Sequence, residues 1–221
     1  MSLWITNQDT NQEKQILVEF LEFYDDATYR GWNEDIIHDV KYYISRVICK
    51  SEREIFQLVL NGFPKEITTK ATLTRQEKLH ASFVGFCYHF EIGTSSNQKK
   101  AIQYYRIAAD HGDGFALSQM GLLFINDYTK YVEYIHKSAR TGHPHGAYKM
   151  AILTSGRSRA FWYLKAAEKN FPHGLTKAAQ FYKMGEYVNT DVHCALRMTL
   201  LVRRAVGEKD FPIDVLGKIF R

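Results

Sequence analysis

The sequence predicts an all-α fold built as a stack of helix pairs, and three observations predict it. Capping boxes, a hydroxyl residue followed three positions later by glutamate, precede apolar residues at helical spacing. Strict apolar–polar alternation over six or more residues, which would indicate a half-buried strand, is hard to find. The second half of the chain also repeats itself with a period of about 30 residues, which is typical of solenoids. About a dozen helices are expected on this pattern.

The first part of the chain predicts three helices and a connector. Capping boxes at Thr10-x-x-Glu13 and Ser51-x-x-Glu54 begin two of them, and Asn33 is the expected N-cap of the helix between. The apolar faces are Ile16, Leu17, Phe20, Leu21 and Tyr24, then Ile36, Ile37, Val40, Tyr43, Ile44, Val47 and Ile48. Gly62 ends the third helix, and residues 63–73 contain Pro64 and three threonines. We therefore expect an N-terminal helical capping region over residues 1–73 and a repeat array over 74–221.

The repeat array begins with the capping box Thr74-x-x-Glu77 and is marked by three helix stops, Gly112, Gly142 and Asn170. Their spacings are 30 and 28 residues. Small residues recur three and four positions before each stop, and bulky ones seven and eight before. The small pairs are Ala108-Ala109, Ser138-Ala139 and Ala166-Ala167, and the bulky pairs are Tyr104-Tyr105, Tyr134-Ile135 and Trp162-Tyr163. Small residues let two helices approach closely, so we expect stacked helix pairs with aromatic side chains filling the gaps.

These residues resemble the Sel-one-like repeat, a relative of the tetratricopeptide repeat. The match is most specific in Val84-Gly85-x-x-Tyr88, Gly93 and Asn97-x-x-Lys100-Ala101-x-x-Tyr104-Tyr105-x-x-Ala108-Ala109-x-x-Gly112. It covers about four degenerate repeats over residues 75–208, and residues 211–221 are expected to form a C-terminal capping helix. Residues 54–61 also look like the short helical module that precedes such repeats in some fungal proteins.

The resemblance implies a right-handed α/α superhelix that binds proteins on its concave face. The function it implies is that of a non-enzymatic scaffold or adaptor in cytoplasmic signalling, with no cofactor. The first helix of each pair would line the groove. The groove residues expected from the repeat positions are His89, Ser118, Leu122, His145, Tyr148, Lys149, Ile152, His173, Thr176, Gln180 and Lys183.

Charge is unevenly distributed along the 221 residues, whose net charge is +5. Residues 1–70 carry 8 basic and 12 acidic side chains, whereas residues 128–183 carry ten Lys or Arg against Glu133 and Glu168. The simplest interpretation of this basic run is a solvated face. A protein or peptide is the expected partner, and an acidic one would complement the charge. The alternative is an RNA- or DNA-binding module that contacts the phosphate backbone, because aromatic residues are interleaved with this basic run.

Several polar groups could form chemical sites, but their surroundings in the sequence favour structural roles. His143-Pro144-His145 lacks the partners of a zinc site and is expected in a turn; a pH-sensitive His145–His173 surface is the alternative. Asp25-Asp26 is expected to be a helix end and Gly112-Asp113-Gly114 a helix-to-helix turn, since no P-loop lysine follows. Three widely spaced cysteines indicate a reducing compartment and no disulfide framework. No secretory signal or membrane span is expected, and no enzyme activity.

Overall fold

The computed structural model describes residues 7–31, 33–63 and 72–205 of the chain. Within these ranges it contains eleven α-helices, one short π-helix and no strand. The chain divides into two compact units, Met1–Gly146 and Ala147–Arg221, so the boundary falls within α8. The all-α repeat class expected from the sequence is confirmed. The expected boundary at 73/74 lies inside the first unit, and the expected capping helix at 211–221 lies outside the described residues.

The first unit opens with a long helix, α1 (Asn7–Arg30), followed by α2 (Asn33–Tyr42), a π-helix over Tyr43–Ile48 and α3 (Glu52–Gly62). The capping box at Ser51 is present, with the Ser51 Oγ accepting from the Glu54 N–H and the Glu54 carboxylate accepting from the Ser51 N–H. The capping box expected at Thr10 is wrong, because α1 begins three residues earlier and Thr10 lies inside it. The predicted stop at Gly62 is confirmed.

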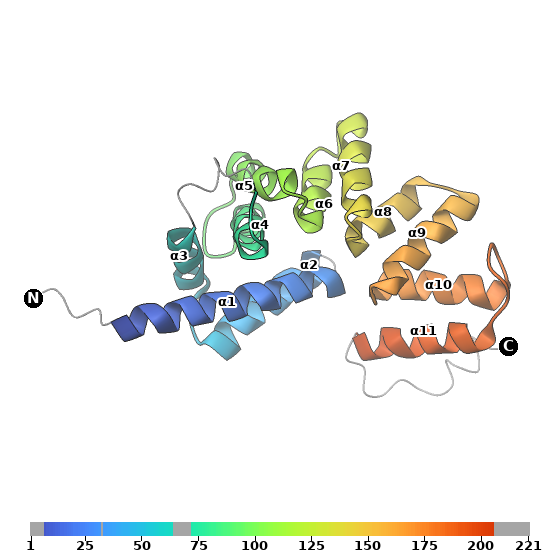
Figure 1. Cartoon of the computed structure of the whole chain (residues 1–221), viewed down its shortest axis with the longest axis horizontal. Helices are drawn as coiled ribbons and strands as arrows, with labels where there is room; N and C mark the ends of the chain where they lie inside the picture. Colours follow the sequence, from blue (N-terminus) through green and yellow to red (C-terminus); the bar gives the residue numbers. More distant parts are fainter. Residues whose placement is uncertain (1–6, 32, 64–71, 206–221) are drawn as a thin grey trace, which may run out of the picture. The chain divides into compact units, whose positions relative to one another are not determined.

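The repeats are helix pairs in which a first helix packs against a second (Figure 1). In the first unit the pairs are α4 (Arg75–Phe90) with α5 (Gln98–Asp110), and α6 (Gly114–Leu123) with α7 (Tyr128–Arg140). Gly112 and Gly142 have φ values of 81° and 83°, the left-handed backbone expected at these stops. The stop at Asn170 has a φ of 57°. All three predicted stops therefore end helices in the way the repeat requires.

Close approach within a pair depends on the small residues of the repeat. A Cβ atom at Gly85 would lie 2.8 Å from the Tyr105 ring, and one at Gly121 would lie 2.7 Å from Ile135 Cδ1. Ala108 and Ala139 are buried in the same pairs. The recurrence of small residues therefore reflects helix contacts too tight for larger side chains.

The second unit continues the pattern over the rest of α8 (Pro144–Leu153), α9 (Gly156–Glu168), α10 (Pro172–Met184) and α11 (Val192–Ala205). A Cβ atom at Gly174 would lie 2.7 Å from Ala166 Cβ, so α9 and α10 meet at the expected small residues. Ala167, Leu175 and Ala178 form a buried cluster, against which Leu164, Met198, Leu201 and Val202 pack. The Asp191 side chain caps α11 by accepting from the Cys194 N–H at 2.8 Å.

Candidate functional site

Helix α1 lies against the first helices of the repeats in the first unit. Its Phe20 and Tyr24 side chains are fully buried, and both rings contact Phe83 of α4, with centroids 4.8 and 4.9 Å apart. The Tyr24 ring also lies 5.5 Å from Phe86 and 6.0 Å from Phe115 of α6. The sequence predicts the apolar face of α1 correctly. The structure adds that this face is held against the side of the repeats that the resemblance assigns to a groove.

Polar contacts fix α1 along its last three turns. Asp25 forms an ion pair with Arg75 at the start of α4. The Tyr24 hydroxyl lies 3.5 Å from Ser82 Oγ, and His145 Nε2 is hydrogen-bonded to the carbonyl oxygen of Gly31, which directly follows α1. These contacts reach from α4 to the first residues of α8. Helix α1 therefore covers the inner face of successive repeats instead of one end of the array.

This arrangement changes the status of the groove residues predicted in the first unit. Ser118 is fully buried and His145 is 1% exposed, so neither is accessible to a partner in this structure. His89 and Leu122 are half-buried. The prediction that Ser118 and His145 are accessible is wrong in this structure, because it assumed that the first helix of each pair is exposed to solvent. In the first unit, α1 and the residue after it contact the same part of the repeats, through Tyr24 with Phe115 and Gly31 with His145.

The groove residues predicted in the second unit are more accessible. On α10, His173, Thr176, Gln180 and Lys183 are exposed, and on α8 Ile152 is exposed. Tyr148 and Lys149 are half-buried, and burial lowers the pKa of the Lys149 ammonium group. The Thr176 hydroxyl donates to the Pro172 carbonyl oxygen at 2.9 Å, so it is engaged within its own helix.

Aromatic packing positions Tyr148 at the centre of this second group. Its ring lies 5.4 Å from Tyr163, 5.7 Å from Phe171 and 5.9 Å from His173. Tyr163 and Phe171 are buried, so they act as a backing for the half-buried Tyr148 and the exposed His173. A rigid aromatic edge beside polar and basic side chains is a composition often found at protein interfaces.

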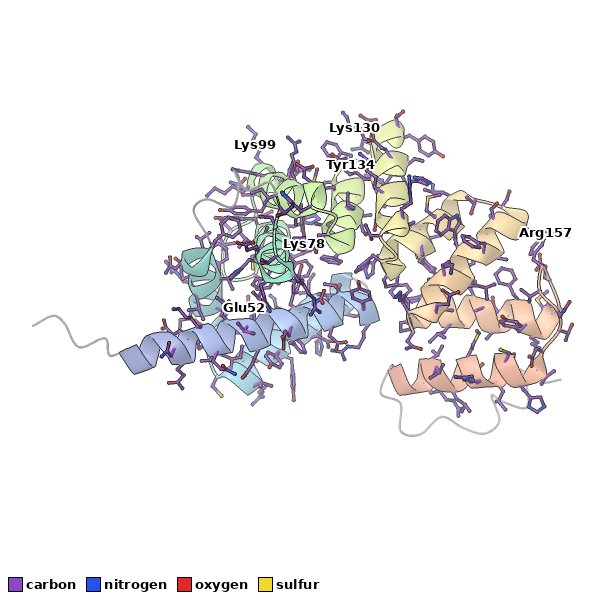
Figure 2. The ribbon with its side chains drawn as sticks, in the orientation of Figure 1. Glu52, Lys78, Lys99, Lys130, Tyr134 and Arg157 are labelled. Atoms are coloured by element: carbon purple, nitrogen blue, oxygen red, sulfur yellow. The ribbon has the colours of Figure 1, made fainter. Side chains whose placement is uncertain are left out.

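The basic run over residues 128–183 is partly neutralised by neighbouring acids. Lys130 pairs with Asp127 at 2.8 Å, Lys137 with Glu133 at 2.6 Å, and Lys165 with Glu168 at 2.9 Å. Figure 2 labels Lys130, Tyr134 and Arg157 in this run. The Tyr134 ring stacks on Phe124 with centroids 5.7 Å apart and is half-buried. Much of the interleaved aromatic surface is thus used in packing, as the repeat offsets predict.

A polar cavity of about 460 Å³ lies where α1, the start of α4 and two repeat turns meet. Asp113 is the N-cap of α6, and its Oδ1 accepts from the Ala116 N–H at 2.6 Å. Burial raises the pKa of the Asp113 carboxyl to about 6, and the negative charge of nearby Asp25 also raises it. The hydrogen bond from the Ala116 N–H acts in the opposite direction and lowers this pKa.

His143 is 3% exposed, and both of its ring nitrogens lack a hydrogen-bond partner among the described residues. Burial lowers the pKa of His143, so its ring is neutral at pH 7.

The remaining features to place are the three cysteines, possible metal ligands and possible membrane-spanning helices. Cys49, Cys87 and Cys194 are free thiols, exposed, buried and half-buried respectively. Across residues 7–31, 33–63 and 72–205, no cluster of three or more His, Cys, Asp or Glu is arranged to hold a metal ion. None of the helices in the same ranges has the length and apolar character needed to cross a membrane.

The fold and the covered inner face define a helical-repeat protein, and comparison with known proteins makes the class more specific. No family model matches the chain. It is 27% identical over 172 residues to a putative sel1-like repeat-containing protein, L21, of Acanthamoeba polyphaga mimivirus, a match that covers 68% of this chain and 32% of that protein. The chain thus spans about a third of the length of this curated relative.

Two solved structures share the fold. A Sel1 repeat protein from Oxalobacter formigenes matches with a TM-score of 0.57 at 15% identity, covering 85% of this chain and 84% of that one. The protein c5321, a protective antigen of uropathogenic Escherichia coli strains displaying an SLR fold, matches with a TM-score of 0.51 at 14% identity, over 95% of this chain and 55% of that one. The chain has the Sel1-like repeat fold. Its resemblance to the fungal type with a lead-in module stays a prediction.

Proposed function

We propose that this protein is a non-enzymatic scaffold that binds a protein or peptide through the first helices of its second unit. The observation that carries the proposal is the contrast in exposure along the predicted groove. Ser118 and His145 are buried, whereas His173, Gln180 and Lys183 are exposed. Proteins of the Sel1-like repeat fold are generally interaction scaffolds. An adaptor role in signalling and a cytoplasmic location remain expectations.

An acidic segment is the partner that the charge favours. Residues 128–183 carry ten basic side chains against two acidic ones, and Lys183 is exposed at the end of α10. Complementary charge accelerates association and excludes partners of like charge more than it adds affinity. Tyr148, with its buried aromatic backing, would supply the apolar contact that such an interface needs.

The experiment is affinity capture by the whole chain, compared with Lys183→Glu and Lys149→Glu, followed by a binding measurement with each captured candidate. Lys99→Glu is the matched control, because Lys99 is exposed on α5 on the side away from α1 (Figure 2). Circular dichroism checks the fold of every variant, since Lys149 is half-buried. We expect the groove variants to weaken binding about ten-fold and Lys99→Glu to leave it unchanged. Equal loss in all three would assign binding to overall charge instead of the groove.

The alternative is phosphate-backbone binding of RNA or DNA by the same basic run. The exposed Arg140, Arg157 and Arg159 support it, and the pairing of Lys130, Lys137 and Lys165 with acids reduces the available charge. Such binding would weaken steeply as salt rises, because condensed counterions are released from the nucleic acid. A gel shift at low salt that disappears near physiological salt would favour this alternative over the scaffold.

A further inference from the structure

Three segments that look unremarkable in the sequence meet around the cavity of about 460 Å³ described above. They are Asp25-Asp26 of α1, Gly112-Asp113-Gly114 between α5 and α6, and His143 between α7 and α8. Arg75 and Lys78 of α4 complete the polar lining, and Figure 2 shows Lys78 on the side of α4 that faces α1. The volume is within the range of small-ligand sites. Neither the scaffold function nor the fold accounts for a polar cavity at this place.

The charge of the lining favours a cation. Four carboxylates, those of Glu22, Asp25, Asp26 and Asp113, face two basic groups, those of Arg75 and Lys78. Arg75 is already paired with Asp25, and Asp26 is paired with Arg30 at 2.8 Å, so the carboxylates of Glu22 and Asp113 remain against Lys78. A helix N-terminus would ordinarily attract an anion, but the Asp113 carboxylate already accepts from the Ala116 N–H at the start of α6. A bound anion would therefore lie against the Asp113 carboxylate. A phosphate site at a helix N-terminus, in contrast, offers N–H groups that are free to donate.

Aromatic rings and an unpartnered imidazole supply the rest of the site. The rings of Tyr29 and His143 lie 4.6 Å apart, and Phe115 lies 5.9 Å from His143. Aromatic faces attract organic cations. A neutral imidazole carries one acceptor nitrogen, and both ring nitrogens of the buried His143 lack a partner among the described residues. An ammonium group could donate to that nitrogen and to the carboxylates.

We propose that this cavity binds an organic ammonium group, carried either by a small free amine or by a lysine side chain of a partner. Asp113 is the principal acceptor, Tyr29 and Phe115 provide aromatic faces, and His143 accepts a further N–H. The cavity belongs to the first unit, so the proposal is independent of the groove on α8 and α10.

Calorimetric titration of the whole chain with n-butylammonium tests the proposal, with 1-butanol as the neutral comparator. We expect saturable binding of the amine and none of the alcohol. Asp113→Asn removes the charge but keeps an efficient N-cap, so the fold should be retained. It should weaken amine binding about ten-fold or more, because a charge-assisted hydrogen bond is lost. Asp110→Asn, at an exposed position of the same helix connection, is the matched control and should change nothing.

A second pair of probes distinguishes the two sources of the ammonium group. Nα-acetyl-lysine amide is compared with n-butylammonium, and its Nε-acetylated form serves as the uncharged comparator. Similar affinity for the two amines would identify a small free amine as the natural ligand, and much tighter binding of the lysine derivative would identify a partner side chain. Tyr29→Leu should weaken both. Binding of neither amine, or equal binding by wild type and Asp113→Asn, would overturn the proposal, whereas Lys183→Glu should leave amine binding unchanged.

Discussion

Replacing Asp113 by asparagine should stabilise the protein above pH 6, although Asp113 is an N-cap. Burial raises the pKa of this carboxyl from 3.8 to about 6 in the folded chain. Between these two pH values the unfolded chain has released the proton and the folded chain still holds it. Folding stability due to this group therefore falls as the pH rises from about 4 to 6, and stays reduced above that. Asparagine makes the same cap without an ionisable group.

The pKa difference sets the size of the effect. A rise from 3.8 to about 6 corresponds to at most about 3 kcal/mol of unfolding free energy. Asp113 retains some contact with solvent, which screens its charge, so we expect a gain of about 1–2 kcal/mol in the asparagine variant.

Urea denaturation of wild type, Asp113→Asn and the control Asp110→Asn, followed by circular dichroism from pH 4 to 8, measures this gain. The free-energy difference between wild type and Asp113→Asn should be near zero at pH 4 and reach its full value by pH 7. A difference that does not change with pH, or a variant less stable at every pH, would refute the reasoning.

Three further predictions test packing and titration. Phe20→Ala should cost about 3–5 kcal/mol of unfolding free energy, measured by urea denaturation, because it empties a fully buried site between α1 and α4. Gly85→Ala should cost about 1–3 kcal/mol in the same assay, since its methyl group would lie 2.8 Å from the Tyr105 ring; no loss would mean that the ring can move. Burial lowers the pKa of His80 to about 4, so the contribution of His80 to the unfolding free energy should fall by up to about 3 kcal/mol as the pH drops from 6.5 to 4, and wild type should lose that much stability relative to His80→Leu over this range. Thermal melts at pH 4.5 and 7 check this last difference, and equal pH dependence would contradict it.

Local structure could be predicted from the sequence because its determinants are local. The stops at Gly112, Gly142 and Asn170 depend on a left-handed residue at a helix end, and the boxes at Ser51 and Thr74 depend on contacts three residues apart. The start of α1 was misplaced because an interior threonine and glutamate reproduce the same spacing as a cap. Such patterns carry no information on whether the preceding turn is already helical.

The π-helix shows a second limit of local patterns. The predicted apolar face that begins at Ile36 continues correctly to Val40 and Ile44, which are fully buried. Val47 is 56% exposed, because the π-helix over Tyr43–Ile48 changes the angular spacing on which the expected face depends. The polar cavity was missed for a different reason: its lining comes from four separate segments between Glu22 and His143, and spacing within the sequence does not record that they meet.

Equivalent repeat positions differ in exposure between the two units. Three residues after each stop lie Phe115, His145 and His173; the first two are 3% and 1% exposed, and His173 is exposed. Helix α1 has 24 residues, a length of about 36 Å, and the Gly31 carbonyl oxygen that follows it binds His145. Within the first unit, contacts with α1 and with Gly31 after it account for the burial of Phe115 and His145.

The residue types on these faces also differ. In the first unit Phe83, Phe86 and Phe115 pack against the apolar face of α1, and the polar Ser118 and His145 are buried as well. At the inner positions of α10 the residues are Thr176, Gln180 and Lys183, which are exposed and polar. A face that meets a partner reversibly must remain stable in water without it, and exposed polar side chains meet that condition. The exposed polar residues of α10 are compatible with such a face.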